Sequence, residues 1–272
     1  MSQQTIDAKN AEFWNELCGT WLARTLGITD VSPETLRRFD EAYLAFYPYL
    51  EKYVTKQNLK GKKVLEIGLG YGTLGQFLAQ QDSDYYGLDI AQGPVDMMRY
   101  RLTQLGRQSS YKVQLGSALD IPYPDESFDY VYSIGCLHHT GNLGKAVSEV
   151  YRVLIPGGKA IVMLYNQHSF RQLVTIPLTR LRSLFVADGR TFAEHIRAMY
   201  DMNSGGEAAP FTEYVSQTKV KHLFQSFSQI KIDIQNFDTY ILFRGRVIIP
   251  REKLLNNLAR LIGLDLYITA TK

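Results

Sequence analysis

The chain has 272 residues, of which 45% are hydrophobic and 21% charged, a composition typical of a globular protein built on one large α/β domain. No apolar run approaches the length of a membrane span, and the N-terminus lacks the basic and apolar regions of a secretory signal, so we expect a cytoplasmic protein. The two cysteines, Cys18 and Cys136, stand far apart, which excludes a disulfide framework and predicts no metal site.

The net charge of +3 is unevenly distributed along the chain. Residues 168–272 carry a net charge of +5, and residues 1–167 carry −2. A bias of this size is typical of a solvated surface. The functional alternative is an anionic substrate or a nucleic-acid partner.

Two helical patterns precede the first strand-like run. The second begins after Ser32, an N-cap residue followed by proline, and continues with large apolar residues at spacings of three and four from Leu36 to Leu50. We therefore predict a helical N-terminal cap over residues 1–60.

Strand-like and helix-like segments alternate over residues 61–167. The strand-like runs are Lys63–Ile67, Tyr85–Ile90, Tyr111–Leu115, Phe128–Ile134 and Lys159–Tyr165. The segments between them are long enough for helices, and Val147, Val150, Tyr151 and Leu154 show the helical period. This alternation predicts βαβ units in a doubly wound parallel sheet.

The alternation is interrupted after Tyr165. Residues 168–212 contain helix-like pieces and a loop, which we interpret as a cap insertion over the carboxyl ends of the strands. The α/β core is expected to resume over residues 213–272. Its predicted elements are a helix at Thr218–Phe227, a strand at Gln229–Gln235, a helix at Arg251–Ile262 and a closing strand at Leu264–Ala270.

The segment from Val64 to Gly75 carries two overlapping glycine patterns that favour different cofactors. The pattern E-x-G-x-G-x-G begins at Glu66, and G-x-G-x-x-G begins at Gly70. A dinucleotide pattern should begin at the first glycine after the strand, and a carboxylate beside its pyrophosphate would be repelled. Here Gly68 follows the strand and Glu66 lies near the strand end, so the first pattern is favoured. An NAD-linked oxidoreductase of the same fold remains the alternative.

Five segments between Gly61 and Asn166 resemble the class I S-adenosylmethionine-dependent methyltransferases of small molecules. They are the glycine segment with Glu66, the strand end at Asp89, the segment Gly116–Asp129, the loop Ser133–Thr140 and the turn Val153–Gly158. The resemblance implies a Rossmann-like sheet of seven mostly parallel strands with an antiparallel last strand. It also implies S-adenosylmethionine as cofactor and S-adenosylhomocysteine as product.

The resemblance also implies a set of cofactor-binding residues. In the core these are Glu66, Gly68, Gly70, Gly72, Asp89, Ile90, Ser117, Ala118, Asp120 and Ser133. Asp89 stands where relatives hold both ribose hydroxyls. Ser117 stands where many relatives have aspartate, so either Ser117 or Asp120 is expected to accept from the adenine amino group. From the N-terminal cap, Trp14 and Tyr47 are expected to face the sulfonium, with core packing as the alternative.

The catalytic residues are expected beside the methyl group. Methyl transfer is an in-line displacement in which alignment supplies much of the rate, and a base is needed only if the acceptor loses a proton. The loop with His138 and His139 should border the methyl group, so these residues are the candidate bases, His139 first. Tyr165 is expected to line the acceptor pocket. Structural packing is the alternative for all three.

The acceptor is expected to be a small organic molecule. The loop after the fourth strand lacks the Asn/Asp-Pro-Pro-aromatic motif that enzymes methylating nucleic-acid amines commonly carry, so we do not expect nucleic acid as a partner. The insertion carries Arg171, Arg180, Arg182, Arg190 and Arg197, which suggests an acid group on the acceptor. The alternatives are an RNA-directed methyltransferase, a basic nucleic-acid-binding protein, and a cofactor-binding subunit without turnover.

Overall fold

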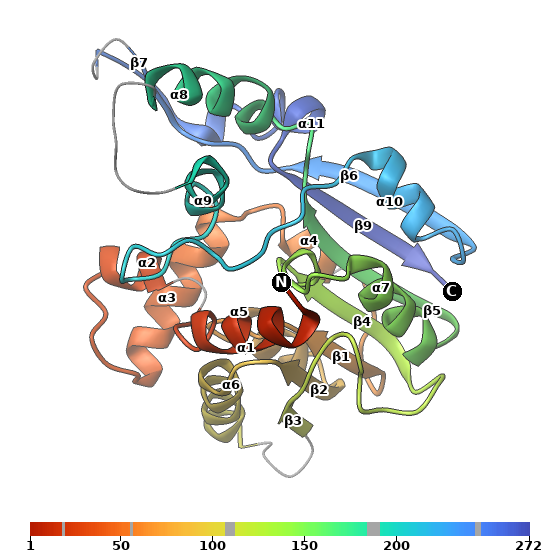
Figure 1. The fold of residues 1–272 in the computed structure, drawn as a ribbon. Helices are drawn as coiled ribbons and strands as arrows, with labels where there is room; N and C mark the ends of the chain where they lie inside the picture. Colours follow the sequence, from red (N-terminus) through yellow and green to blue (C-terminus); the bar gives the residue numbers. More distant parts are fainter. Residues whose placement is uncertain (18–19, 55–56, 107–111, 184–190, 243–245) are drawn as a thin grey trace.

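The computed structural model describes residues 1–17, 20–54, 57–106, 112–183, 191–242 and 246–272. A seven-stranded sheet runs through the middle of the molecule in the order β3-β2-β1-β4-β5-β9-β6 (Figure 1). Its strands are β1 Lys63–Ile67, β2 Asp84–Asp89, β3 Lys112–Leu115, β4 Phe128–Ile134, β5 Leu154–Tyr165, β6 Gln229–Gln235 and β9 Asp265–Thr271.

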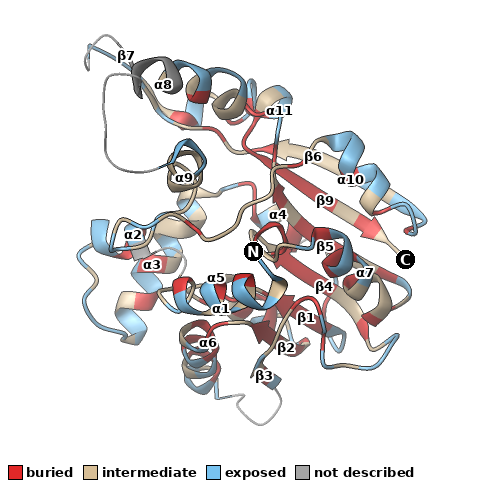
Figure 2. Cartoon of the chain, in the orientation of Figure 1, coloured by how far each residue is buried: buried red, intermediate tan, exposed pale blue. Residues whose placement is uncertain are grey.

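The sheet confirms the predicted fold class. Strands β1 to β5 pair in parallel, and β9 lies antiparallel between β5 and β6. The central strands are buried on both faces, which is why they appear in the sequence as nearly continuous apolar runs (Figure 2). The last strand of the chain is the antiparallel one, as expected.

Helices cover both faces of the sheet. On one face α7, Leu143–Val153, and α10, Gln217–Leu223, contribute to one apolar cluster. On the other face α4 Glu51–Val54, α5 Thr73–Gln80 and α6 Gln92–Gln104 contribute to a second cluster. The turn of α7 with Val147 and Val150 is buried as its helical period predicts.

The N-terminal segment is helical, as predicted. It contains α1 Gln3–Phe13, α2 Thr20–Thr25 and α3 Pro33–Phe46. The Ser32 hydroxyl caps α3, accepting from the Thr35 amide, and proline occupies the first helical position. Helix α1 is tied to the loop after β4, because Gln3 donates to the Thr140 carbonyl at 2.6 Å and Asn10 donates to the His139 carbonyl at 2.8 Å.

The segment after β5 leaves the sheet and returns to it. It forms a π-helical turn at Arg171–Thr175, α8 Ile176–Ser183 and α9 Phe192–Ala198, and a bridge between Asn166 and Val215 brings the chain back. The boundaries of the predicted cap, insertion and core segments stay predictions.

Two features near the C-terminus differ from the sequence prediction. A short hairpin, β7 Tyr240–Leu242 and β8 Val247–Ile249, was not predicted. The predicted helix at Arg251–Ile262 is wrong: the chain forms a 3₁₀ turn at Arg251–Lys253, irregular turns, and a single helical turn, α11 Ala259–Ile262. Two consecutive asparagines, which compete with the backbone for hydrogen bonds, interrupt the helix.

No helix in the described part of the chain is both long enough and apolar enough to cross a bilayer.

A buried arginine ties the helical cap to the core. The Arg101 side chain on α6 is fully buried and donates to both Asp40 carboxylate oxygens of α3, at 2.8 and 2.9 Å. It also donates to the Gln76 side chain on α5 and to the Tyr71 carbonyl in the glycine segment. One guanidinium therefore fixes three helices and the glycine segment relative to one another.

Replacing Arg101 with leucine should lower the free energy of unfolding by about 3 kcal/mol, because Asp40 and the Tyr71 carbonyl lose their donor in a largely buried place. Urea unfolding followed by circular dichroism measures this change. The control is Arg37→Leu, whose side chain is exposed on α3 and should leave the unfolding midpoint almost unchanged. Equal effects of the two substitutions would contradict this role of Arg101.

Candidate active site

A cavity lies at the carboxyl ends of β1, β2 and β4, where the glycine segment begins. Gly68 follows β1 directly with a φ of 84°, and a Cβ there would collide with the Cys136 side chain from the loop after β4. Gly72 caps α5 without a side-chain hydrogen bond. The backbone can therefore approach a ligand closely and present the amide groups of the first turn of α5.

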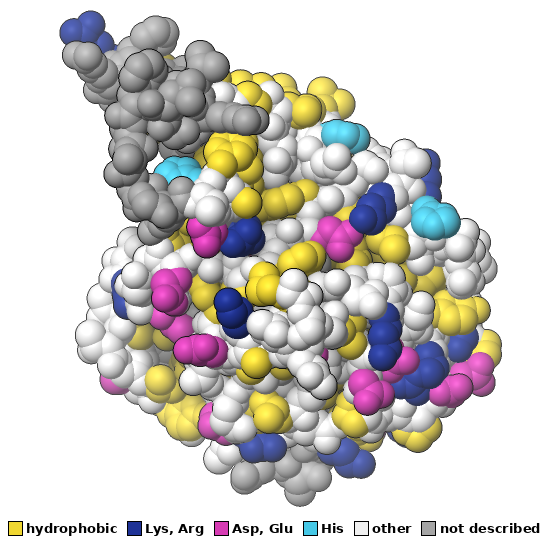
Figure 3. All heavy atoms as spheres, in the orientation of Figure 1, with side chains coloured by type: hydrophobic (Ala, Val, Ile, Leu, Met, Phe, Trp, Pro, Cys, Tyr) yellow, Lys and Arg dark blue, Asp and Glu magenta, His cyan; other side chains and the backbone are white. Residues whose placement is uncertain are grey.

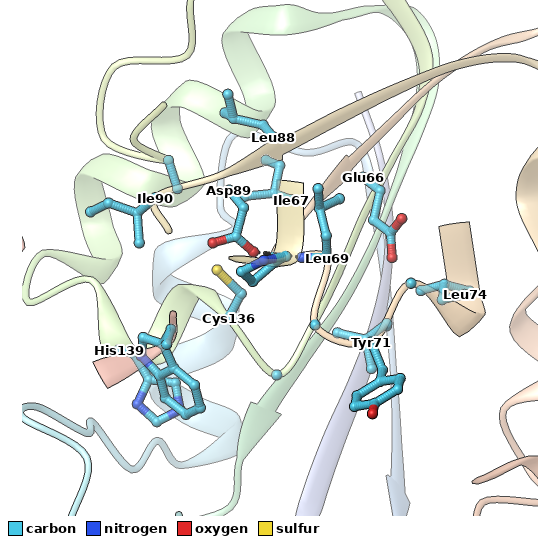
Figure 4. Close-up of a pocket in the computed structure, with 18 of the residues that line it drawn as sticks. Glu66, Ile67, Leu69, Tyr71, Leu74, Leu88, Asp89, Ile90, Cys136 and His139 are labelled. Atoms are coloured by element: carbon cyan, nitrogen blue, oxygen red, sulfur yellow. Dashed lines mark hydrogen bonds between the residues drawn. The ribbon is translucent and has the colours of Figure 1, made fainter. Parts of the chain in front are cut away.

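Asp89 ends β2 and faces this cavity. Its carboxylate accepts from the Leu69 amide at 2.8 Å and from the Ala91 amide at 2.9 Å, and it is directed towards the centre of the site beside Cys136 (Figure 4). Burial raises the pKa of Asp89 to about 6, although the backbone donors oppose this shift. Each carboxylate oxygen can accept a second hydrogen bond, so Asp89 can hold two neighbouring hydroxyl groups.

Glu66, at the end of β1, lies in a different environment. Its carboxylate is directed away from Asp89 towards α5 and accepts from the Tyr85 hydroxyl (Figure 4). Burial raises the pKa of Glu66 to about 8, so the side chain is mostly protonated at neutral pH. A Cβ at Gly75 would collide with the Glu66 carboxyl and the Tyr85 hydroxyl. Gly75 therefore has a packing role, and G-x-G-x-x-G needs no dinucleotide to explain it.

A second cavity of about 460 Å³ adjoins the first. Both are lined by Trp14, Tyr43, Ile134 and Gly135. The second cavity extends between the N-terminal segment, the ends of β5 and β9, and the insertion after β5. Its lining includes Tyr165, which was expected to line an acceptor pocket, and Tyr47, which was expected at the cofactor.

His139 lies where the two cavities meet. It lines the first cavity, its ring packs against Trp14 with 4.8 Å between centroids, and its Nδ1 lies 2.7 Å from the Phe211 carbonyl oxygen. A carbonyl can only accept, so Nδ1 carries the hydrogen and Nε2 of the neutral ring is free to accept one. Nε2 is buried without a hydrogen-bond partner among the residues that the structure describes. Burial lowers the pKa of His139, which favours this neutral form.

Asp201, from the insertion, completes the cluster around His139. One oxygen of Asp201 lies 3.6 Å from His139 Nε2, and the Tyr165 hydroxyl donates to both oxygens at 3.0 and 3.1 Å. Burial raises the pKa of the Asp201 carboxyl. Nothing in the sequence around Asp201 marked it, because the irregular segment after α9 has no periodicity that places it. His138 is fully buried against the Tyr165 ring and lines neither cavity.

The described arginines around the second cavity bind protein groups. Arg171 donates to both Asp238 carboxylate oxygens and to the Met199 carbonyl. Arg251 donates to the carbonyls of Phe46 and Phe237 and to the Asn236 side chain. Arg197 donates to the Ala209 carbonyl. Arg190 lies outside the described residues, and the side chains of Arg180 and Arg182 are not among those described.

The part of the chain that forms the cavity at β1, β2 and β4 is similar to known proteins. Residues 65–162 match the family model of a methyltransferase domain. This range contains the glycine segment, Asp89 and the loop with His139. Residues 65–162 therefore form a methyltransferase domain, similar to those of class I S-adenosylmethionine-dependent methyltransferases.

Two curated methyltransferases illustrate the extent of the similarity. Demethylmenaquinone methyltransferase of Symbiobacterium thermophilum is 33% identical over 106 residues, which are 38% of this chain and 42% of that protein. Ubiquinone biosynthesis O-methyltransferase of Pseudomonas fluorescens is 29% identical over 119 residues, which are 44% of this chain and 51% of that protein. The chain thus spans about half of the curated relatives that it matches.

A solved structure shows that the similarity in fold extends further. An S-adenosylmethionine-dependent methyltransferase from Mesorhizobium loti has a TM-score of 0.55 at 16% identity, covering 84% of this chain and 98% of that chain. The methyltransferase domain implies S-adenosylmethionine as methyl donor. The residues of the first cavity fit this cofactor. At Gly68 there is no room for a Cβ, so the backbone of the glycine segment can approach a ligand closely, and the Asp89 carboxylate can accept further hydrogen bonds besides those from Leu69 and Ala91.

Most of the residues predicted to bind the cofactor line the first cavity. They are Trp14, Glu66, Gly68, Gly70, Gly72, Asp89, Ile90, Ser117 and Ala118. Asp120 is exposed and does not line it, which favours Ser117 as the adenine contact. Ser133 is buried and donates to the Ile67 carbonyl at 3.0 Å, so its hydroxyl supports the sheet. Asn10 and Thr140 line the cavity and were not predicted. Direct contacts with the cofactor stay predictions.

Glu66→Gln should remove one component of the pH dependence of stability. Burial raises the Glu66 pKa from 4.5 to about 8, so between these pH values the folded chain holds a proton that the unfolded chain has released. Binding of this proton stabilises the folded state, and the stabilisation is lost as the pH rises from 4.5 to about 8. Between about pH 5.5 and 7.5 the wild type should lose about 1.4 kcal/mol per pH unit relative to the variant. Urea unfolding without added cofactor measures the difference at each pH.

The matched control is Glu12→Gln, which changes an exposed carboxylate on α1. Its stability relative to the wild type should not vary with pH in this way. A constant difference between wild type and Glu66→Gln across the window would show that Glu66 is ionised in the folded chain.

Proposed function

We propose that the chain is an enzyme that transfers the methyl group of S-adenosylmethionine to a small organic acceptor bound in the second cavity. The observation that carries this proposal is that Trp14, Tyr43, Ile134 and Gly135 line both cavities. A cofactor in the first cavity and an acceptor in the second would therefore meet at a shared wall. Such alignment supplies much of the rate of an in-line displacement.

The names of the relatives support a small acceptor. Those described above are named for demethylmenaquinone and for ubiquinone biosynthesis, and a third relative, 36% identical over 103 residues, is named a fatty-acid O-methyltransferase. The matched residues belong to the cofactor-binding core. The residues around the second cavity come largely from outside that core, so the identity of the acceptor is not inherited from these relatives.

Of the predicted catalytic residues, His139 has the strongest support as a base. Its Nε2 is a free acceptor among the described residues and lies beside Asp201 at the junction of the cavities. Tyr165 supports this pair by donating to Asp201. His138 lines neither cavity, so the observations support only a role in positioning the Tyr165 ring against which it packs.

An acid group on the acceptor has less support than the sequence suggested. Arg171 is neutralised by Asp238, and Arg251 binds carbonyl and amide oxygens of the chain. The nucleic-acid alternatives also have little support. On the face shown in Figure 3, basic and acidic side chains are interspersed and form no broad basic surface. The methyltransferase match likewise does not favour an NAD-linked oxidoreductase.

Calorimetry with S-adenosylhomocysteine and with NAD tests the cofactor. The adenosyl ligand should bind in the micromolar range and NAD should not bind, because the residues that match a methyltransferase domain include the glycine segment and Asp89. Asp89→Asn should weaken S-adenosylhomocysteine binding about tenfold or more, since charge-assisted hydrogen bonds are lost.

Asp120→Asn is the matched control, because Asp120 is exposed outside the cavity and its replacement should leave the affinity unchanged. Binding of NAD alone, or equal effects of the two substitutions, would overturn the proposed cofactor site. Transfer of a labelled methyl group to a panel of small molecules then tests turnover.

A further inference from the structure

The second cavity contains more acidic than basic side chains. The charged residues that line it in the described part of the chain are Glu16, Arg171, Asp201, Asp238, Arg251 and Asp265. Four carboxyl groups thus face two guanidinium groups. This excess of acidic side chains was not expected from the sequence, because the arginines of the insertion suggested a positively charged pocket.

Three of the four carboxyl groups are bound by arginine or by backbone or side-chain amides of the chain. Asp238 binds Arg171. Glu16 accepts from the Ser204 amide with both oxygens at 3.0 Å. Burial raises the pKa of Asp265 to about 7, and a hydrogen bond from Asn236 together with the charges of Arg171 and Arg251 opposes this shift. Asp238 therefore balances the charge of Arg171, and Arg251 donates to carbonyl and amide oxygens of the chain.

Asp201 is the exception. Among the described residues, no Lys or Arg lies within ion-pair distance of its carboxylate, Arg171 acts on it only from a greater distance, and its side chain is only 13% exposed. The Tyr165 hydroxyl donates one hydrogen, which leaves most of the accepting capacity of the carboxylate unused. A buried carboxylate without a cation is costly, and a positively charged ligand would remove that cost.

The surroundings of Asp201 are aromatic. Tyr165 packs against Tyr200 with 4.7 Å between ring centroids, and Trp14 packs against His139. All four rings lie in the walls of the two cavities or beside Asp201. Aromatic faces attract cations, and the attraction is stronger where water is excluded.

We propose that the acceptor is a small amine on an apolar or aromatic body, which binds in the second cavity as an ammonium ion with Asp201 as its counter-ion. This inference rests on the proposed function, because it names the class of molecule that the second cavity accepts. It replaces the acid group that the arginines of the insertion suggested.

The pair formed by Asp201 and His139 also suits the chemistry of an amine. An ammonium nitrogen has no lone pair, so one N–H proton must leave before the nitrogen can form a bond to carbon. His139 Nε2 can accept that proton, and Asp201, 3.6 Å away, then stabilises the imidazolium. The nitrogen regains its lone pair, and the charge remains balanced within the cluster.

Three probes of similar shape and different charge test the proposal. Phenethylamine is a cation at neutral pH, phenethyl alcohol is neutral and phenylacetate is an anion. Their affinities are measured by calorimetry with the 272-residue chain saturated with S-adenosylhomocysteine. Phenethylamine should bind about tenfold more tightly than the alcohol, and phenylacetate should bind most weakly. Equal affinities, a preference for the alcohol or the acid, or no binding of the amine would overturn the proposal.

Asp201→Asn should reduce the affinity for phenethylamine to that for the alcohol and leave the affinity for the alcohol unchanged. Asp96→Asn, at an exposed position on α6, is the control and should change neither. An unchanged preference for the amine in Asp201→Asn would overturn the role of Asp201. The comparison of probes in the wild type does not depend on the folding of any variant.

The outcomes separate this inference from the function on which it rests. If S-adenosylhomocysteine binds and the amine is not preferred, the amine acceptor is wrong and the methyltransferase function stands. If S-adenosylhomocysteine does not bind the wild type, the proposed function fails, and the choice of acceptor fails with it.

Discussion

The candidate site depends on how closely the glycine segment after β1 approaches the end of β2 and the loop after β4. The Leu69 amide reaches the Asp89 carboxylate at 2.8 Å, so the segment after β1 and the end of β2 are held together by one charge-assisted hydrogen bond. Gly68 allows this approach because the space of a Cβ is filled by Cys136, from the loop after β4. Three strand ends thus converge on one point, and Arg101 fixes the far side of the same segment through the Tyr71 carbonyl. Any ligand at this point meets backbone donors whose positions are set by the sheet.

Two carboxyl groups near this point, Asp89 and Glu66, differ in pKa because different hydrogen-bond donors surround them. Asp89 accepts from two backbone amides and faces the cavity, which offsets part of the cost of burying its charge. Glu66 is more deeply buried and accepts from one tyrosine hydroxyl, which leaves burial as the dominant influence on its pKa. The sequence presents both as acidic residues at strand ends, and only the tertiary structure distinguishes them. A charged role at neutral pH is therefore better supported for Asp89.

The core of the fold could be predicted from the sequence because its strands are buried on both faces and its helices have one apolar face. The bounds of β1, β4 and β6 are the predicted ones, and the antiparallel β9 differs by one residue at each end. The helix predicted at Arg251–Ile262 failed because buried contacts of Arg251 and the paired asparagines override a weak helical period. In the candidate site, the residues on the glycine segment and at the end of β2 were predictable from local pattern. Tyr47, Asp120 and Asp201 were not, since their distance from a cavity depends on how separate segments pack.

On the proposed function, the second cavity explains how chains can share a cofactor-binding core and differ in acceptor. Besides the ends of β5 and β9, its walls include residues from segments that the core does not position by sequence pattern: Trp14 after α1, Tyr47 after α3, and Asp201 after α9. The Glu16 carboxylate accepts from the Ser204 amide, which links the N-terminal segment directly to the insertion. Substitutions in either segment can therefore reshape the cavity while the Asp89 side of the site stays intact. The family match over residues 65–162 is consistent with this division, because it includes the glycine segment, Asp89 and His139 and excludes Asp201. On the proposed function, the methyl donor is specified by the core, and the charge of the acceptor is specified by one carboxylate that the insertion brings to His139.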